Sequence, residues 1–241
     1  MDIVVGKKEE LSKKIAEEIA EFVNKKKNAV LGLPTGTTPL DIYANLIKMN
    51  KSGQVSFKDV ATFNLDEYIG LEPDDKQSYR YFMDSNLFNH IDIDKAKTHV
   101  LKGTGDYVSY MQNYDKLIDE FGGIDIQLLG IGSDGHIGFN EPGTSFNTLT
   151  HIAELTDSTI KDNSRLFDDI SQVPTTAVTM GLKSIMKARR VILLATGKNK
   201  AKAIYELING KMTEEMPCSI LQQHPNCTIY VDNDAYSMVR N

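Results

Sequence analysis

Short runs of apolar and β-branched residues alternate along the chain with longer segments of helical periodicity. The apolar runs span residues 28–33, 59–64, 124–131, 190–196 and 227–232, and the helical segments span 8–27, 39–50, 77–88, 106–121 and 199–209. In the first helical segment, Leu11, Ile15 and Ile19 share one apolar stripe. Alternation of this kind is typical of βαβ units, which build an open, mostly parallel sheet with helices on both faces. The sequence therefore predicts an α/β fold.

The chain of 241 residues is long enough for one large α/β domain, and its 41% hydrophobic content can form a buried core. It contains no internal repeat, low-complexity tract or linker, so we expect one domain over residues 1–241. Residues 155–178 are polar and poorly periodic. We expect this segment to extend from the core as a mobile excursion.

The composition of the chain limits the kinds of molecule that it is expected to bind. The formal net charge is −6 and the pI is about 5.4, so no basic face for nucleic acid is expected. The two cysteines, Cys218 and Cys227, lack the spaced partners of a zinc site or a disulfide framework. The first residues do not form a signal peptide, and no apolar run is long enough to span a membrane. We therefore expect a soluble cytoplasmic protein; a small anionic ligand remains compatible with this composition.

Four unusual motifs follow predicted strands directly. "PTGTTP" follows Leu33, "LDEYIGL" begins just after Asn64, the loop "GIGSDGHIGFNEPG" covers residues 130–143, and "TGKNK" follows Ala195. The carboxyl ends of parallel strands lie at one edge of a sheet, where open α/β sheets bind their ligands. We expect these four segments to meet at one site.

The loop 130–143 combines Asp134, His136 and Glu141 with several glycines. An imidazole within reach of two carboxylates has a fixed tautomer and raised basicity, so it can transfer protons near neutral pH. A metal site is an alternative, although no second histidine lies at ligand spacing, and a purely structural loop is another. His90, His99, His151 and His224 stand alone in the sequence and are interpreted as structural.

The other motifs carry groups suited to acid–base chemistry and anion binding. Asp66 and Glu67 follow an apolar strand, and we expect one of them to be catalytic and the other to anchor the loop. Thr35, Gly36, Thr37 and Thr38 lead into a helix whose free N–H groups suit a phosphate, although a simple capped turn is the alternative. The loop lacks the Gly-Lys-Ser/Thr ending of a nucleotide-binding P-loop. Lys198 and Lys200 oppose the dipole of the helix that they begin, so a bound anion would explain them.

Together these blocks resemble the glucosamine-6-phosphate deaminase family. The resemblance covers nearly the whole chain, through "LGLPTGTTP", "VSFKDVATFNLDEYIGL", "QSYRYFM", "GIGSDGHIGFNEPG", "NSRLFDD", "QVPTTAVTMG" and "SILQQHP". It implies a Rossmann-like fold and the conversion of glucosamine 6-phosphate and water to fructose 6-phosphate and ammonia, in amino-sugar catabolism. It implies no metal and no organic cofactor.

The resemblance also implies roles for individual residues. Asp66 would move a proton between C2 and C1 of the open sugar, and His136 would assist ring opening, held and tuned by Asp134 and Glu141. The phosphate would be bound by Thr35, Gly36, Thr37, Thr38, Arg165 and Lys200. The segment 155–178 resembles the family's active-site lid, which would bring Arg165 onto the phosphate when it closes.

The chain departs from the family pattern in two places. Thr37 replaces the second glycine that many members have in the phosphate loop, and we expect a small effect. Where the allosteric hexamers carry basic residues that bind N-acetylglucosamine 6-phosphate, this chain has His151, Ala153 and Glu154, and its last residues are "DNDAYSMVRN", without the longer tail of those hexamers. We expect a monomer without an allosteric effector.

Two alternatives share the fold. A 6-phosphogluconolactonase also has an Asp-Gly-His loop, but it typically has Asp-Glu-Arg where this chain has "DEY" and Leu-Phe-Pro near "NEP". The sugar-phosphate-sensing domain of a transcription regulator usually lacks the catalytic residues, all of which are present here. Fold alone does not separate these functions.

Overall fold

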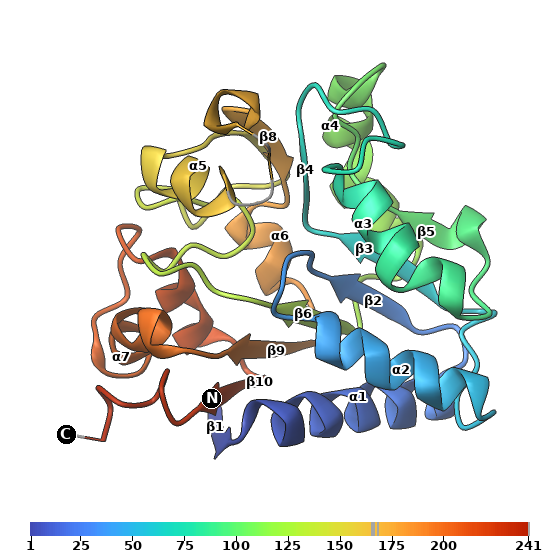
Figure 1. Ribbon diagram of the computed structural model, residues 1–241, viewed down its shortest axis with the longest axis horizontal. Helices are drawn as coiled ribbons and strands as arrows, with labels where there is room; N and C mark the ends of the chain where they lie inside the picture. The colour runs from blue at the N-terminus through green and yellow to red at the C-terminus, as the bar shows by residue number, and fades with distance from the viewer. Residues whose placement is uncertain (165–166, 168, 241) are drawn as a thin grey trace.

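The computed structural model describes residues 1–164, 167 and 169–240, and a seven-stranded sheet lies at its centre (Figure 1). In spatial order, the strands are β1 (Asp2–Gly6), β10 (Cys227–Asp232), β9 (Arg190–Ala195), β6 (Ile126–Leu129), β2 (Val30–Leu33), β3 (Ala61–Asn64) and β5 (Thr98–His99). Neighbouring strands pair in parallel throughout. The predicted α/β class with a mostly parallel open sheet is confirmed.

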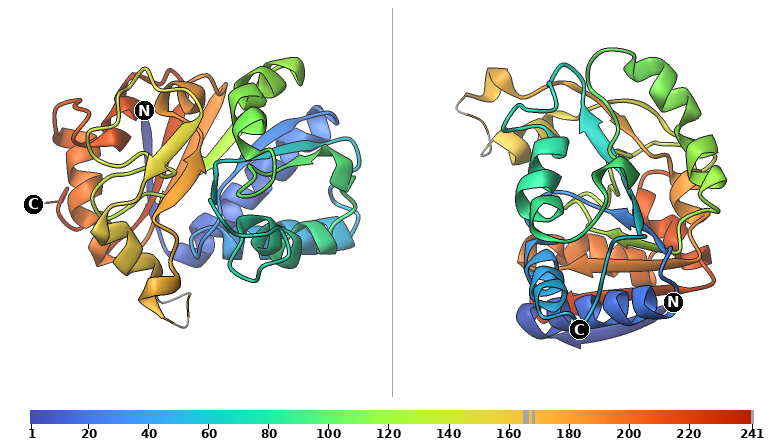
Figure 2. Two further views of the ribbon diagram at one scale, coloured as in Figure 1. Left: turned by 90° about the horizontal axis from the view of Figure 1, so that it is seen from above. Right: turned by 90° about the vertical axis from the view of Figure 1, so that its right-hand side faces the viewer.

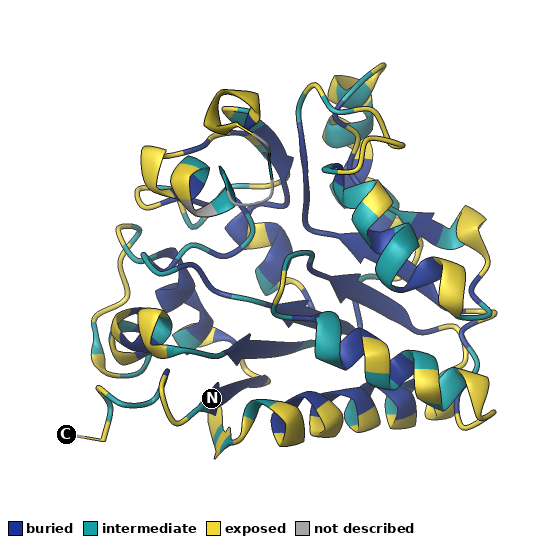
Figure 3. Cartoon of the chain, viewed as in Figure 1, coloured by how far each residue is buried: buried dark blue, intermediate teal, exposed yellow. Residues whose placement is uncertain are grey.

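Helices cover both faces of this sheet. One face packs against α1 (Lys8–Lys25), α2 (Leu40–Lys51) and α3 (Tyr79–Asn86), and the other against α4 (Tyr107–Glu120), α6 (Leu182–Met186) and α7 (Ala201–Asn209). Successive strand residues alternate between the two cores, as Leu193 and Leu194 do, because side chains point to opposite faces of a strand. Figure 3 shows the inner strands of the large sheet buried and the outer helix surfaces exposed.

A second, antiparallel sheet of three strands stands above the carboxyl edge of the first. Its order is β4 (Asp66–Tyr68), β8 (Thr176–Thr179) and β7 (His151–Glu154). Only Leu65 separates β3 from β4, so the chain leaves one sheet and enters the other at Asp66, which pairs with Thr179. Strand pairing on both sides of Leu65 therefore fixes the backbone that carries Asp66.

The segment predicted as a lid contains two short helices, α5 (Asp157–Asn163) and η4 (Ile170–Gln172). The Thr156 side chain caps α5 by accepting a hydrogen bond from the Thr159 N–H. In both views of Figure 2, η4 lies farthest from the body of the molecule, beyond α5. The last residues of the segment belong to β8, where Ala177 and Val178 are fully buried, so the projecting part ends before Thr176. Lid movement stays a prediction.

The direction of strand addition reverses in the middle of the large sheet. From β2 the chain adds β3 and β5 on one side, and from β6 it adds β9 and β10 on the other. The loops that follow β2 and β6 therefore diverge, which opens the crevice where such sheets bind ligands. None of the described helices is long and apolar enough to cross a membrane.

Candidate active site

A cavity of about 580 Å³ opens at this reversal point. Its walls include the loop 35–38 after β2, Asp66 at the start of β4, His136 in the loop after β6, and Lys200 after β9. The four segments that were predicted to meet at the carboxyl edge do meet there. Asp134 and Glu141 lie behind His136, Lys198 is not among the described wall residues, and Arg165 lies outside the described part of the chain.

The loop 35–38 connects β2 to the amino-terminal end of α2. Gly36 has a φ of +84°, a left-handed conformation that glycine adopts without strain. No described residue other than glycine has a positive φ. Thr37, at the position where the resemblance implies a second glycine, therefore has an ordinary backbone conformation. The hydroxyl of buried Tyr43 donates a 2.5 Å hydrogen bond to the Pro34 carbonyl and fixes the start of the loop. The free N–H groups of the first turn suit an anion.

Asp66 and Glu67 are both buried but have different environments. Glu67 accepts hydrogen bonds from the N–H groups of Tyr68 and Tyr79 at 2.9 Å and of Arg80 at 3.0 Å, so it anchors the start of α3. Asp66 faces the cavity. Burial, reinforced by the Glu67 charge, raises the pKa of Asp66 to about 7, although His136 partly offsets both effects. A carboxylate with such a pKa is an effective base near neutral pH.

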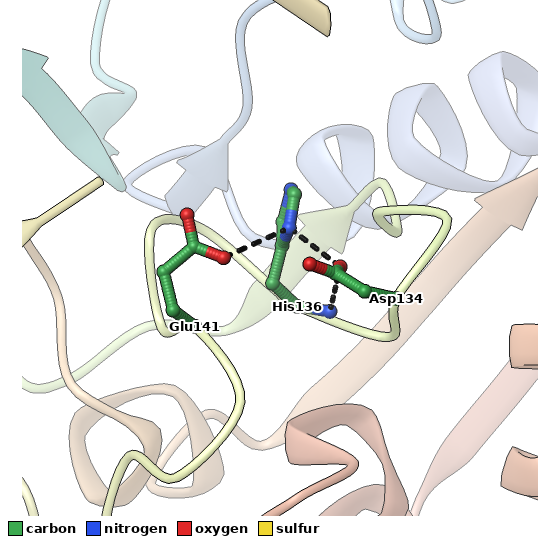
Figure 4. A group of neighbouring side chains, drawn as sticks. All are labelled: Asp134, His136 and Glu141. Atoms are coloured by element: carbon green, nitrogen blue, oxygen red, sulfur yellow. Dashed lines mark hydrogen bonds and ion pairs between the residues drawn. The ribbon is translucent and has the colours of Figure 1, made fainter. Parts of the chain in front are cut away.

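His136 forms the centre of a cluster with Asp134 and Glu141 (Figure 4). Its Nδ1 lies 2.8 Å from Asp134 Oδ1 and 3.5 Å from Glu141 Oε2, and its backbone N–H donates to Asp134 at 3.2 Å. Burial opposes a charge on the imidazole, but the interactions with both carboxylates outweigh burial and raise the His136 pKa to about 9. The pKa of Asp134 falls to about 2, because the interactions with His136 outweigh partial burial. Between these two pKa values the pair is an imidazolium and a carboxylate.

The same cluster could hold a metal ion, since its three ligand atoms all lie within 4.8 Å of one another. Figure 4 shows both carboxylates on the Nδ1 side of the ring, with the other ring nitrogen pointing away from them. A cation bound here would take Nδ1 as its ligand and would replace the proton shared with Asp134. The cluster therefore acts either as a charged histidine or as a metal site, and chelation distinguishes the two.

Several wall residues carried no predicted role. Tyr79 and Phe139 stack with ring centroids 6.0 Å apart, and both line the cavity. Lys161 and Asn163 reach the wall from α5, and Asn163 donates a 2.8 Å hydrogen bond to the Tyr68 hydroxyl. Lys8, from the start of α1, also lines the cavity. Lys8, like Lys200, lies at the start of a helix, so the dipole argument that predicts an anion near Lys200 applies equally to Lys8.

Comparison with known proteins agrees with this geometry. A family model described as glucosamine-6-phosphate isomerases/6-phosphogluconolactonase matches residues 7–230. A glucosamine-6-phosphate deaminase of Mycoplasma mycoides subsp. mycoides SC is 52% identical over 99% of this chain and 97% of its own. That of Thermoanaerobacter pseudethanolicus is 50% identical over 98% of this chain and 94% of its own.

Solved structures show the same relationship. A structure described as a monomeric glucosamine-6-phosphate deaminase is 41% identical and aligns with a TM-score of 0.96 over 99% of this chain and 100% of that chain. The 6-phosphogluconolactonase from Trypanosoma brucei, 19% identical, covers 98% of this chain and 97% of its own with a TM-score of 0.79, which shows a shared fold alone. The chain belongs to the family of glucosamine-6-phosphate isomerases and 6-phosphogluconolactonases.

Proposed function

We propose that this protein converts glucosamine 6-phosphate and water to fructose 6-phosphate and ammonia. The observation that carries the proposal is that Asp66 and His136 both line one cavity, with pKa values of about 7 and about 9. Near pH 8 this pair supplies a carboxylate base and a charged acid at the same time. The deaminases at about 50% identity over nearly the whole chain support this substrate over a lactone.

The first chemical step is opening of the sugar ring. Protonated His136 donates a proton to the ring oxygen as the C1–O5 bond breaks, and the C1 hydroxyl releases its proton to solvent water, which leaves an aldehyde at C1 and a hydroxyl at C5. Asp134 and Glu141 hold the imidazole and stabilise its charge. Acid–base assistance of this kind contributes about 10²–10⁴ in rate.

The second step moves a proton between adjacent carbons. The Asp66 carboxylate removes the C2 proton. The electron pair of the broken C2–H bond forms a C1–C2 double bond, and the aldehyde oxygen takes a proton from solvent water. Return of the proton from Asp66 to C1 leaves an imine at C2. Water adds to this imine, and breakage of the C2–N bond releases ammonia and forms the C2 ketone of fructose 6-phosphate. The atoms balance without an oxidant or reductant.

The phosphate end of the substrate is assigned to the loop 35–38 and Lys200, with Arg165 as a predicted further ligand. Loop N–H groups and an ammonium are strong phosphate partners. Because the phosphate lies away from C1 and C2, its binding energy orients the reacting carbons against Asp66. The predicted lid segment, 155–178, would close over this site with the part that precedes β8.

Ammonia release from glucosamine 6-phosphate, measured beside an Asp66→Asn variant, tests the assignment. We expect equal amounts of ammonia and fructose 6-phosphate from the unsubstituted protein, and loss of both in the variant. Release of neither product, with hydrolysis of 6-phosphogluconolactone instead, would assign the chain to the other activity of its family. Binding of the sugar phosphate without either reaction would indicate a sensor.

We infer further that the enzyme is an unregulated monomer. In β7, Ala153 is buried and Glu154 is exposed and acidic, so these positions offer no basic site to a sugar-phosphate effector. The TM-score of 0.96 to a structure described as monomeric supports this assembly state. Rates should depend hyperbolically on substrate, and a sigmoidal curve made hyperbolic by N-acetylglucosamine 6-phosphate would contradict the inference. A charged sugar phosphate does not cross membranes unaided, so cytoplasmic catabolism suits this reaction.

A further inference from the structure

The helices α1 and α2 run side by side (Figure 1), and both begin at the carboxyl edge of the sheet, since each follows a parallel strand. Lys8 is the first residue of α1, and Asp41 is the second residue of α2. The Lys8 Nζ lies 2.8 Å from Asp41 Oδ2, so this ion pair joins the two helix starts. Because α2 begins directly after the loop 35–38, the ion pair places the Lys8 ammonium beside that loop.

Helix stability does not explain this arrangement. The Lys8 and Asp41 side chains are 40% and 46% exposed, and ion pairs with such exposure contribute little to folding. A lysine in the first turn also opposes the helix dipole. The same position favours a bound anion, which would interact with the ammonium and with the N–H groups of α2 together.

The charge of the cavity wall also favours binding of an anion. Among the described wall residues, three lysines, Lys8, Lys161 and Lys200, accompany a single acidic residue, Asp66. The chain as a whole has a formal net charge of −6. A local excess of positive charge within an acidic protein indicates a binding site for an anion.

We propose that Lys8 is a substrate-binding residue that contacts the phosphate group, with Asp41 holding its ammonium beside the loop 35–38. This inference rests on the proposed function of the cavity and adds a residue to its phosphate site. Lys8 begins α1 and the base Asp66 begins β4, and the phosphate group is unchanged by the reaction, so Lys8 contributes equally to binding of substrate and transition state. Its loss should raise KM and leave kcat nearly unchanged.

The decisive comparison is between Lys8→Met and Lys7→Met. Both variants remove one positive charge at the start of α1, but Lys7 is exposed and is not among the described wall residues. We expect Lys8→Met to raise the KM for glucosamine 6-phosphate about tenfold with kcat within about twofold, the effect of losing one charge-assisted hydrogen bond. The Kd of inorganic phosphate, measured by calorimetry, should rise by a similar factor. Lys7→Met should leave both constants unchanged.

Two further variants separate binding from a structural role. Lys8→Arg keeps the charge and should restore KM to within about threefold of the unsubstituted protein. Asp41→Asn breaks the same ion pair but keeps the lysine, so a merely structural pair would give Lys8→Met and Asp41→Asn equal losses in thermal stability and unchanged KM values. That result, or a phosphate Kd in Lys8→Met equal to that of Lys7→Met, would overturn the inference.

The phosphate measurement also separates this inference from the proposed reaction. If the unsubstituted protein releases no ammonia from glucosamine 6-phosphate, the proposed reaction fails. The Kd of inorganic phosphate still tests Lys8 in that case. If ammonia is released and neither KM nor the phosphate Kd responds to Lys8→Met, the reaction stands and the role of Lys8 fails.

Discussion

Replacement of Asp134 by Asn tests whether the carboxylates around His136 raise its pKa and so keep it charged as the acid of the reaction. The Asn side chain has nearly the same shape, and its oxygen can still accept the 3.2 Å hydrogen bond from the His136 backbone N–H. What it removes is the negative charge 2.8 Å from Nδ1. The Glu141 oxygen, 3.5 Å from Nδ1, would remain.

The size of the effect follows from this geometry. A hydrogen bond to a charged group contributes about 1.5–3 kcal/mol, and one pKa unit corresponds to about 1.4 kcal/mol. The His136 pKa should therefore fall by about one to two units, from about 9 to between about 7 and 8. At pH 8 the charged fraction of His136 would fall by about two- to tenfold, whereas near pH 6 it would change little.

Two measurements check this prediction. In the pH profile of kcat/KM, the acidic limb near pH 7 reports Asp66 and should stay in place, while the basic limb near pH 9 should move to lower pH. An NMR titration of the His136 ring gives the pKa directly, whichever step limits the rate. Glu141→Gln is the matched control and should shift the pKa less, since its oxygen is farther away. An unchanged His136 pKa in Asp134→Asn would refute the reasoning.

Three further predictions follow from the same site. Asp66→Asn should raise the free energy of unfolding at pH 8 by about 2–4 kcal/mol, because burial raises the Asp66 pKa from 3.8 to about 7 and the folded protein then bears an unfavourable charge. This gain in the free energy of unfolding should shrink as the pH falls from 7 to 4. Urea unfolding at pH 8 and at pH 4 measures it, and an equal gain at the two pH values would contradict the burial argument. Gly132→Ala should lower kcat about tenfold or more while the protein stays folded by circular dichroism, since the new Cβ would lie 2.4 Å from the His136 ring. Exhaustive chelation should leave ammonia release unchanged, and restoration of a lost rate by added metal would assign the His136 cluster to metal binding instead.

The sequence predicts the site more completely than the local structure around it. Strand ends can be located from apolar runs, and parallel strands necessarily bring their carboxyl ends to one edge, so the meeting of residues 35–38, Asp66, His136 and Lys200 was predictable. The predicted strand at 124–131 is longer than β6, which covers Ile126–Leu129, because Gly130 and Ile131 already belong to the cavity wall. Apolar character alone does not distinguish a strand residue from a buried loop residue.

The three-stranded sheet was harder to predict. Its strands β4, β8 and β7 have three or four residues each, and their pairing depends on contacts between distant parts of the chain. Lys8 was missed for a related reason. The strand that precedes Lys8, β1, lies four places from β2 in the sheet, and the lysine lies at the cavity because α1 packs beside α2 with the two helix starts joined by the Lys8–Asp41 ion pair.

The different protonation of Asp66 and His136 depends on the sheet arrangement. Asp66 begins β4, one residue after β3, and pairs with Thr179 of β8; burial there favours its neutral form. His136 is also buried, but its loop supplies two carboxylates that outweigh the burial. The opposite environments separate the two pKa values in the direction that leaves the base ionised and the acid charged between about pH 7 and pH 9. If Asp66 were exposed to solvent, its pKa would fall and it would be too weak a base. If His136 lost its carboxylate partners, its pKa would fall and it would lose its proton. Either change would remove the pH range in which the base is ionised and the acid is charged.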